Sequence, residues 1–338
     1  MIDLLIFFIG ASLWLYVLLG GSDYGAGIIE LWPAGSLRTA QKKVINHAMG
    51  PVWEANHMWL ILIVVILFMG FPPIFTTLMV YLHLPMLALL GGIVVRGAAF
   101  TFRHYDAVQA KRSQRVYTVI FGLSSLWTAF WLGIIVASLN RGLIDREAAS
   151  FWTAYIAPWW GWFPVAVGGF VVCIFGFLAS IFLVGETDDP VLQRRFTRHA
   201  AGLNGLVILS GAGVFFTSLG EANNLMHAFL RDPRLLSVLV IATLLCVALW
   251  RFINRRHVYR MRAVAAGQVT LILVGWLLLY APNALTTAEG PVNFYTAASP
   301  PATLRQLVIA LLVGSVFIFP SLLYLFRVFK LTPPSSDD

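Results

Sequence analysis

The feature that most constrains this chain is a series of nine apolar runs, each about as long as the roughly 20 residues that an α-helix needs to cross a bilayer. Hydrophobic residues make up 59% of the sequence and charged residues only 11%, whereas soluble domains carry roughly a quarter. We therefore expect an all-α polytopic membrane protein, with a single transmembrane domain over residues 1–330 and a disordered cytoplasmic tail over 331–338. The predicted helices cover about residues 4–31, 52–70, 74–102, 114–139, 162–184, 200–219, 234–252, 263–281 and 303–328.

The lysines and arginines predict which way the helices run. Of the 23 basic residues, 17 lie in one alternate set of loops and five in the other, while Arg96 lies inside the third predicted helix. Because loops rich in lysine and arginine stay on the cytoplasmic side, we expect the N-terminus outside and the C-terminus in the cytoplasm. This distribution also accounts for the net charge of +8, since the basic loops face anionic membrane lipid and no nucleic acid is needed as a partner.

The densest group of polar residues lies at the start of the second predicted helix, where Glu54 follows Pro51 near the cytoplasmic end. A carboxylate at a helix N-terminus can simply complement the helix dipole. However, Asp23 and Glu30 in the first predicted helix lie on the same side of the membrane, on one helical stripe with Gly27. Partly desolvated carboxylates in this position are suited to passing protons inward from the cytoplasm, so Glu54 and Asp23 are the candidate proton carriers.

Three further polar residues accompany these carboxylates. Asn56 and His57 follow Glu54 in the same helix and are candidate relays, although a lone histidine at a helix end is more often structural. Arg96 lies deep in the third predicted helix, where an unpaired cation is costly, so we expect it to pair with Glu54 or Asp23. A purely structural buried pair is the alternative interpretation.

Haem ligation by this chain can be tested against depth in the membrane. Only His57 and His83 lie inside predicted spans, His57 near the cytoplasmic end and His83 about nine residues in from the outer end. Across a core of about 30 Å this separates them by more than roughly 10 Å, too far for two axial ligands of one iron. Cys173 and Cys246 lack C-x-x-C spacing, so the sequence predicts no metal site in this chain.

Several motifs, in order along most of the chain, resemble subunit II of the cytochrome bd family of quinol oxidases. The most specific is GPVWEANHMWLI over residues 50–61. The supporting motifs are LGGSDYGAG over 19–27 followed by Glu30, RGAAFTFR over 96–103, Ala297 to Ser299 with Thr303 and Leu304, and Pro320 to Tyr324.

This resemblance implies two four-helix bundles plus one peripheral helix. It also implies a heterodimer in the bacterial plasma membrane with a homologous subunit I, which carries haem b, haem d and the quinol site. Such a complex oxidises quinol, reduces O₂ to water and takes up the protons from the cytoplasm, and the present chain would be its haem-poor accessory subunit. The resemblance leaves open a structural quinone or lipid on this chain and a small third subunit.

The resemblance also assigns roles to individual residues. The acidic residue that the family places on a proton route at the subunit interface corresponds to Glu54, and the acidic residue of the first helix corresponds to Asp23. Glu54 replaces a commoner aspartate, which keeps the charge and lengthens the reach. Thr101 stands where many members have Glu or Asp, so the step of the proton route at this position is in question. Asn56 and Arg96 are supporting residues.

Two alternatives compete with a proton-conducting oxidase subunit. The chain could be a stand-alone secondary transporter in which Asp23, Glu54 and Arg96 bind a substrate or coupling ion. Against this alternative, the two carboxylates lie toward one side of the membrane and no paired broken helices are apparent. The other alternative is a purely structural scaffold for subunit I, which differs only in how variants of the carboxylates behave.

Overall fold

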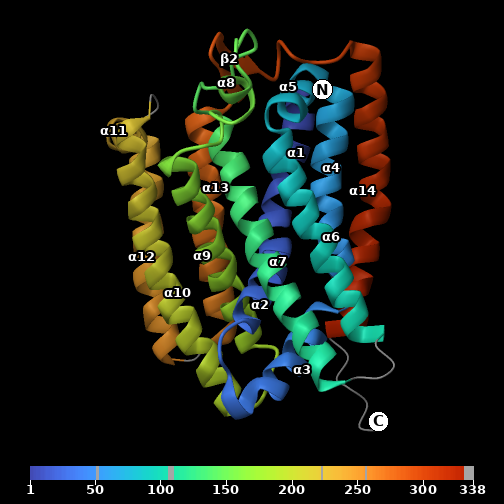
Figure 1. The fold of residues 1–338 in the computed structure, drawn as a ribbon, viewed down its shortest axis with the longest axis vertical. Coiled ribbons are helices and arrows are strands. Elements are labelled where there is room, and N and C mark those ends of the chain that lie inside the picture. The colour runs from blue at the N-terminus through green and yellow to red at the C-terminus, as the bar shows by residue number, and fades with distance from the viewer. Residues whose placement is uncertain (51–52, 106–109, 222–223, 256, 331–338) are drawn as a thin grey trace.

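The structure of the protein is a computed structural model that describes residues 1–50, 53–105, 110–221, 224–255 and 257–330. Figure 1 shows long helices side by side along the longest axis, with short helices and strands at the ends. Nine helices among the described residues are long and apolar enough to cross a membrane, which confirms the predicted all-α class. They cover Ile2–Glu30, Trp53–Gly70, His83–Arg103, Arg112–Ser138, Trp162–Val184, Pro190–Gly220, Pro233–Ile253, Val258–Tyr280 and Pro301–Leu325. The predicted tail, 331–338, lies outside the described residues.

The elements that build these spans and their connections have the following bounds. The spans contain α1 (Ile2–Leu15), α2 (Gly21–Glu30), α4 (Trp53–Gly70), α6 (His83–Tyr105), α7 (Lys111–Ser138), α9 (Trp162–Val184), α10 (Pro190–Thr217), α12 (Pro233–Arg255), α13 (Val258–Tyr280) and α14 (Pro301–Lys330). The connections contain α3 (Arg38–Met49), α5 (Pro72–Tyr81), α8 (Phe151–Tyr155), α11 (Leu225–Arg231), β1 (Asn283–Thr287) and β2 (Gly290–Asn293).

The first span contains a π-helical turn, Tyr16–Gly20, between α1 and α2. In this turn the carbonyl of Leu19 accepts hydrogen bonds from Ser22 Oγ (2.8 Å) and Asn56 Nδ2 (3.4 Å). Every residue of α2 is buried, whereas α1 buries only Leu5 and Ser12. The half of the span that carries the acidic residues therefore lies inside the protein.

The third span differs from the prediction of one helix over residues 74–102. The chain forms α5 and α6 instead, and they meet at Leu82, whose φ of −112° and ψ of 22° are not helical. Pro85 explains the break, because proline has no N–H to donate to the carbonyl of Tyr81 and its ring would clash with that carbonyl in a continuous helix. As a result, His83 begins α6 and does not lie nine residues inside a span.

The sixth span begins at Pro190, well before the predicted start near residue 200. Asp189 caps the first turn, because its side chain accepts a hydrogen bond from the backbone N–H of Val191 (2.8 Å). Proline suits the first helical position, since a backbone N–H at that position would have no partner within the helix. The basic residues from Arg194 to Arg198 are therefore helical, whereas the sequence analysis placed them in a loop.

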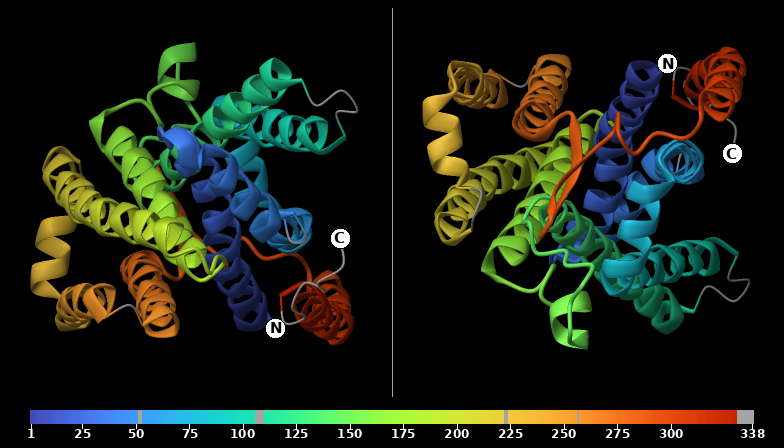
Figure 2. Two further views of the ribbon diagram at one scale, coloured as in Figure 1. Left: turned by 90° about the horizontal axis from the view of Figure 1, so that it is seen from below. Right: turned by 90° about the horizontal axis from the view of Figure 1, so that it is seen from above.

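Helix α9 is the centre of the packing. It contacts α2 and α7 of the N-terminal half and α10 and α13 of the C-terminal half. Helix α6 packs along α7 and α12 along α13, while α14 contacts α4 and α1 and lies at the margin of the molecule (Figure 2). The two halves are thus joined through α9, and a division into two four-helix bundles plus a peripheral helix stays a prediction.

The connections at the end opposite α3 are held together by a hairpin and an ion pair. Strands β1 and β2 form an antiparallel hairpin. Beside it, Arg141 makes a two-bonded ion pair with Glu221 (2.8 and 2.9 Å). The same guanidinium donates to the carbonyls of Ala157, Pro158 and Trp160 (3.1–3.2 Å), which ties the α8 segment to the end of α10.

The close approach of α2 to α9 depends on Gly25. A Cβ at this position would lie 1.8 Å from the carbonyl oxygen of Phe175 and 2.7 Å from Cβ of Ala179, so no side chain fits without moving α9. We expect Gly25→Ala to lower the thermal unfolding temperature of the purified protein and its monodisperse yield. Gly10→Ala is the matched control, because a Cβ there meets nothing within 4 Å. Equal unfolding temperatures for the two variants would contradict the importance of this contact.

Candidate functional site

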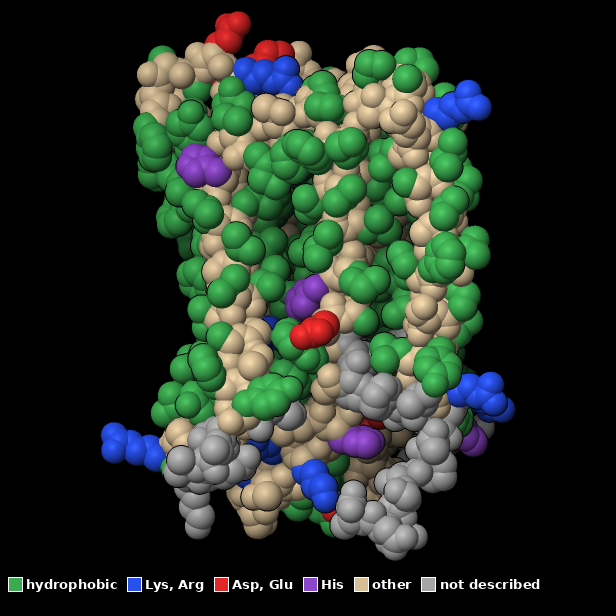
Figure 3. Space-filling view, turned by 90° about the vertical axis from the view of Figure 1, so that its right-hand side faces the viewer, with side chains coloured by type: hydrophobic (Ala, Val, Ile, Leu, Met, Phe, Trp, Pro, Cys, Tyr) green, Lys and Arg blue, Asp and Glu red, His purple; other side chains and the backbone are tan. Residues whose placement is uncertain are grey.

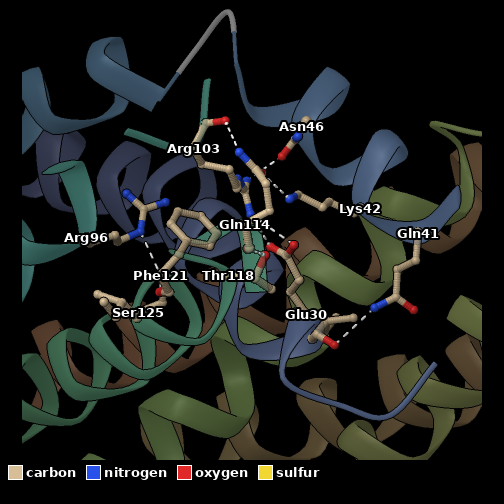
Figure 4. Close-up of polar contacts among 12 residues, drawn as sticks. Glu30, Gln41, Lys42, Asn46, Arg96, Arg103, Gln114, Thr118, Phe121 and Ser125 are labelled. Atoms are coloured by element: carbon tan, nitrogen blue, oxygen red, sulfur yellow. Dashed lines mark hydrogen bonds and ion pairs between the residues drawn. The ribbon is translucent and has the colours of Figure 1, made fainter. Parts of the chain in front are cut away.

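The centre of the candidate site is an ion pair between Asp23 on α2 and Arg96 on α6. Nη2 of Arg96 lies 2.6 Å from Oδ1 of Asp23, and both side chains are 1% exposed. The guanidinium also donates through Nε to Ser125 Oγ on α7 (3.0 Å), a contact that Figure 4 shows. Its carbon lies 4.8 Å from the ring centroid of Tyr24 and 4.9 Å from that of Phe121. Arg96 is thus surrounded by groups that favour a cation, although it lies within the membrane-spanning region.

This geometry decides between the two partners expected for Arg96. The carboxylate that pairs with it is Asp23, not Glu54. Among the described residues, neither carboxylate oxygen of Asp23 accepts a hydrogen bond of regular geometry, so its contact with Arg96 is an ion pair without further donors. Asp23 therefore keeps free acceptor positions deep inside the protein.

A second buried ion pair lies two helical turns away along the same two helices. Nη1 of Arg103 donates to both carboxylate oxygens of Glu30 (2.9 and 2.8 Å), and Nη2 donates to Oδ1 of Asn46 on α3. The guanidinium lies over the Phe121 ring, 4.7 Å from its centroid. Phe121 thus lies between the two arginines. The arginines are seven residues apart in the sequence, and so are Asp23 and Glu30, which corresponds to roughly 10 Å along a helix.

The second pair was not expected from the sequence, which assigned Arg103 to a loop. The signal was nonetheless present, because Arg96 and Arg103 repeat the seven-residue spacing of Asp23 and Glu30, and residues seven apart share one helical face. If α2 and α6 form an ion pair at Asp23 and Arg96, the same two faces meet again two turns later, at Glu30 and Arg103.

A polar network continues from the second pair toward α3, as Figure 4 shows. Gln114 on α7 donates to the carbonyl of Arg103 (3.1 Å) and accepts from Nζ of Lys42 (2.7 Å). Partial burial, followed by the nearby charge of Arg103, lowers the pKa of Lys42. Gln41 donates to the carbonyl of Ile29 (3.3 Å), so α3 is hydrogen-bonded to the end of α2.

Glu54 lies on α4 apart from both ion pairs. Its side chain is exposed and makes no hydrogen bond or ion pair within the part of the chain that the structure describes. Asn56 is buried and held by the carbonyl of Leu19. His57 is half-buried, with its ring 5.8 Å from that of Tyr24, the neighbour of Asp23. His57 thus lies beside a residue that contacts the buried pair.

Thr101 does not join this cluster. Its side chain is exposed, while its neighbours Phe100 and Arg103 are buried. The structure therefore brings together Asp23, Arg96 and His57, and it leaves Glu54 and Thr101 on the surface.

His83 lies away from this cluster, because it is the first residue of α6 and Arg96 lies in the second half of that helix. Its Nδ1 lies 2.7 Å from the carbonyl oxygen of Val80, and its ring packs against Tyr155 of α8. Because Arg96 lies thirteen residues further along α6, His83 and the residues beside Arg96 are separated by roughly 20 Å. That His57 and His83 do not share an iron stays a prediction.

The fold and these pairs define a multi-pass membrane protein whose core holds acid–base pairs between its first and third spans. The family model of the cytochrome bd terminal oxidase subunit II matches residues 1–329. The chain therefore belongs to the subunit II family of the cytochrome bd terminal oxidases.

Two individual comparisons agree with this assignment. The cytochrome bd ubiquinol oxidase subunit 2 of Bacillus subtilis (strain 168) is 24% identical over 196 residues, which are 58% of this chain and only 56% of that relative. A chain in the solved structure of the bd oxidase from Geobacillus thermodenitrificans superposes with a TM-score of 0.75 at 18% identity, over 98% of this chain and 99% of that chain. At this identity the superposition shows a shared fold.

The Asp23–Arg96 pair generates a prediction for stability. Arg96→Met leaves a buried carboxylate without its cation, which costs about 3–5 kcal/mol of unfolding free energy for pairs of this kind. Combining it with Asp23→Asn removes both charges, so we expect the double variant to be more stable than Arg96→Met alone. Denaturant unfolding in detergent measures both. Arg234→Gln is the control, because its pair with Asp232 is largely exposed, and we expect little change from it. Additive losses in the double variant would exclude coupling between the two side chains.

Proposed function

We propose that this chain is the accessory, haem-poor subunit of a terminal oxidase that oxidises quinol and reduces O₂ to water. In this proposal haem b, haem d and the quinol site lie in subunit I, with which the chain forms a heterodimer in the bacterial plasma membrane. The N-terminus lies outside and the C-terminus in the cytoplasm, as the distribution of lysine and arginine indicates. Membership of the subunit II family and the shared fold support this proposal.

The observation that carries the proposed proton role is the contrast between Glu54 and the buried carboxylates. Asp23 and Glu30 each face an arginine, whereas Glu54 has no cation beside it among the residues that the structure describes. A proton can neutralise Glu54 without breaking an ion pair, whereas protonating Asp23 would leave Arg96 as an unpaired buried charge. We infer that Glu54 takes up the protons and that Asp23 supplies negative charge further along the route.

The proposed route inward from Glu54 follows one face of α4. His57 lies one turn further on this face, and its ring lies 5.8 Å from that of Tyr24, which supports His57 as the relay from Glu54 in this proposal. Asn56 and Arg96 have positioning roles in this proposal. Asn56 donates a hydrogen bond to the backbone carbonyl of Leu19, and Arg96 neutralises the charge of Asp23. Thr101 has a hydroxyl that can hold a water molecule but no carboxylate, so it stores no proton in this proposal.

The surface around Glu54 fits contact with another membrane chain. Helices α4 and α6 expose large apolar side chains here, including Ile61, Phe68 and Leu90. Figure 3 shows this face as mostly hydrophobic, with one acidic side chain and one histidine side by side near its middle. Because a carboxylate facing acyl chains is costly, we propose that subunit I covers Glu54 and completes its surroundings.

The proton role predicts a specific defect in the Glu54→Gln variant of the assembled complex. We expect quinol-driven O₂ consumption to fall on the order of a hundredfold, the lower end of what a positioned proton-transfer group contributes, while haem content stays unchanged. Glu54→Asp keeps a carboxylate and should retain most of the activity. Oxygen uptake and the optical haem spectrum of the same preparation measure the two quantities separately.

The matched control is Glu147→Gln, which removes an exposed carboxylate from the segment before α8 at the opposite end of the molecule. We expect normal oxygen uptake from it. Loss of haem from Glu54→Gln would indicate the scaffold role alone, and unchanged oxygen uptake with unchanged haem would exclude Glu54 from the proton route.

A further inference from the structure

A groove lies between the start of α10 and the segment that follows α2. It consists of two adjoining pockets of about 340 and 350 Å³, which share the side chains of Arg198 and His199. Three arginines of the first turns of α10 and Leu37 line one pocket, while Trp32 and Leu206 are among the residues that line the other. The groove is therefore basic at one end and apolar at the other.

The basic end is built on a fixed support. Arg195 is held in place by hydrogen bonds from Nε to Gln41 Oε1 (2.8 Å) and from Nη2 to the carbonyl of Pro33 (2.6 Å). Arg194 and Arg198, one turn apart on the same stripe of α10, are exposed and make no hydrogen bond or ion pair in the described ranges. Two guanidinium groups are thus presented side by side with free donors.

His199 lies in the middle of the groove, because it lines both pockets. The ring of His199 packs against that of Trp32, with 4.6 Å between centroids. Its Nδ1 is buried and has no hydrogen-bond partner within the part of the chain covered by the structure. The rings of His199 and Trp32 therefore join the basic end of the groove to its apolar end.

The apolar end continues into the membrane-spanning part of α10. Gly202 lines the groove and a Cβ there would meet nothing within 4 Å, so the wall is open at this point. Leu206 is 46% exposed and lies eight residues beyond Arg198, roughly 12 Å along the helix. A small inorganic anion would use only the basic end, whereas an amphiphile would use the whole length.

We propose that this groove binds one anionic phospholipid, with its phosphate between Arg194 and Arg198 and an acyl chain along Gly202 and Leu206. The charge complementarity is that of guanidinium groups with phosphate, and Arg is the side chain best suited to such contacts. The lipid stabilises the junction of α10 with the segment after α2, because Arg195, His199 and Trp32 all belong to both the groove and this junction. This inference does not depend on the proton role of Glu54.

Native mass spectrometry of the full assembled complex in detergent, titrated with phosphatidylglycerol, tests the proposal. The test variant is Arg194→Gln combined with Arg198→Gln. We expect it to retain one phosphatidylglycerol fewer than the wild type, with an affinity lower by roughly 25-fold, since each cation near an anionic lipid contributes about fivefold. Arg112→Gln combined with Arg115→Gln is the control, because these exposed arginines occupy the first turns of α7 and line neither pocket.

Two further arms separate the lipid from other ligands. Leu206→Asn should also weaken retention of phosphatidylglycerol, since the acyl chain contacts this residue, and phosphatidylcholine should not replace the lost molecule. Equal retention by the wild type and the double arginine variant would overturn the proposal. Displacement of the lipid by millimolar inorganic phosphate, or an unchanged affinity in Leu206→Asn, would also overturn it in favour of a simple anion site.

Discussion

The constraint on which the rest of the structure depends is the neutralisation of charge between the first and third spans. Two arginines and two carboxylates lie inside the membrane-spanning region, where an unpaired charge is costly. They become tolerable only when α2 and α6 keep a common register over two turns, with Phe121 of α7 between the arginines. Close contacts of α2 with α9, which Gly25 permits, then fix the position of these helices relative to the second half of the chain.

This arrangement also separates two kinds of acidic residue. Asp23 and Glu30 hold helices together, and their charges are balanced within the chain. Glu54 is exposed, and large apolar side chains of α4 and α6 are exposed on the same part of the surface. This separation of internal, paired charges from an outward-facing carboxylate is the basis for our proposal that Glu54 meets a neighbouring subunit.

Hydrophobicity alone was sufficient to predict the number of spans, because each span is a long run of mostly apolar residues. It was insufficient at Leu82, where Pro85 breaks the helix although the apolar run continues on both sides. It was also insufficient at Pro190, where the helix includes basic residues outside the apolar run. The pairing of Arg96 with a carboxylate followed from the cost of an isolated charge. Which carboxylate pairs with Arg96 could not be predicted in this way, and neither could the Glu30–Arg103 pair. Both depend on the rotation of the helices about their axes, which composition does not show.

The π-helical turn at Tyr16–Gly20 has a consequence for how this chain tolerates insertions and deletions. One residue corresponds to about 100° of rotation in an α-helix. The wider turn therefore sets the phase of α2 independently of α1, so that Asp23 and Glu30 face α6 although α1 is oriented by its own contacts with α4. A single deletion there would keep the hydropathy profile of the span intact while turning both carboxylates away from their arginines. The length of this segment thus carries as much information as its composition.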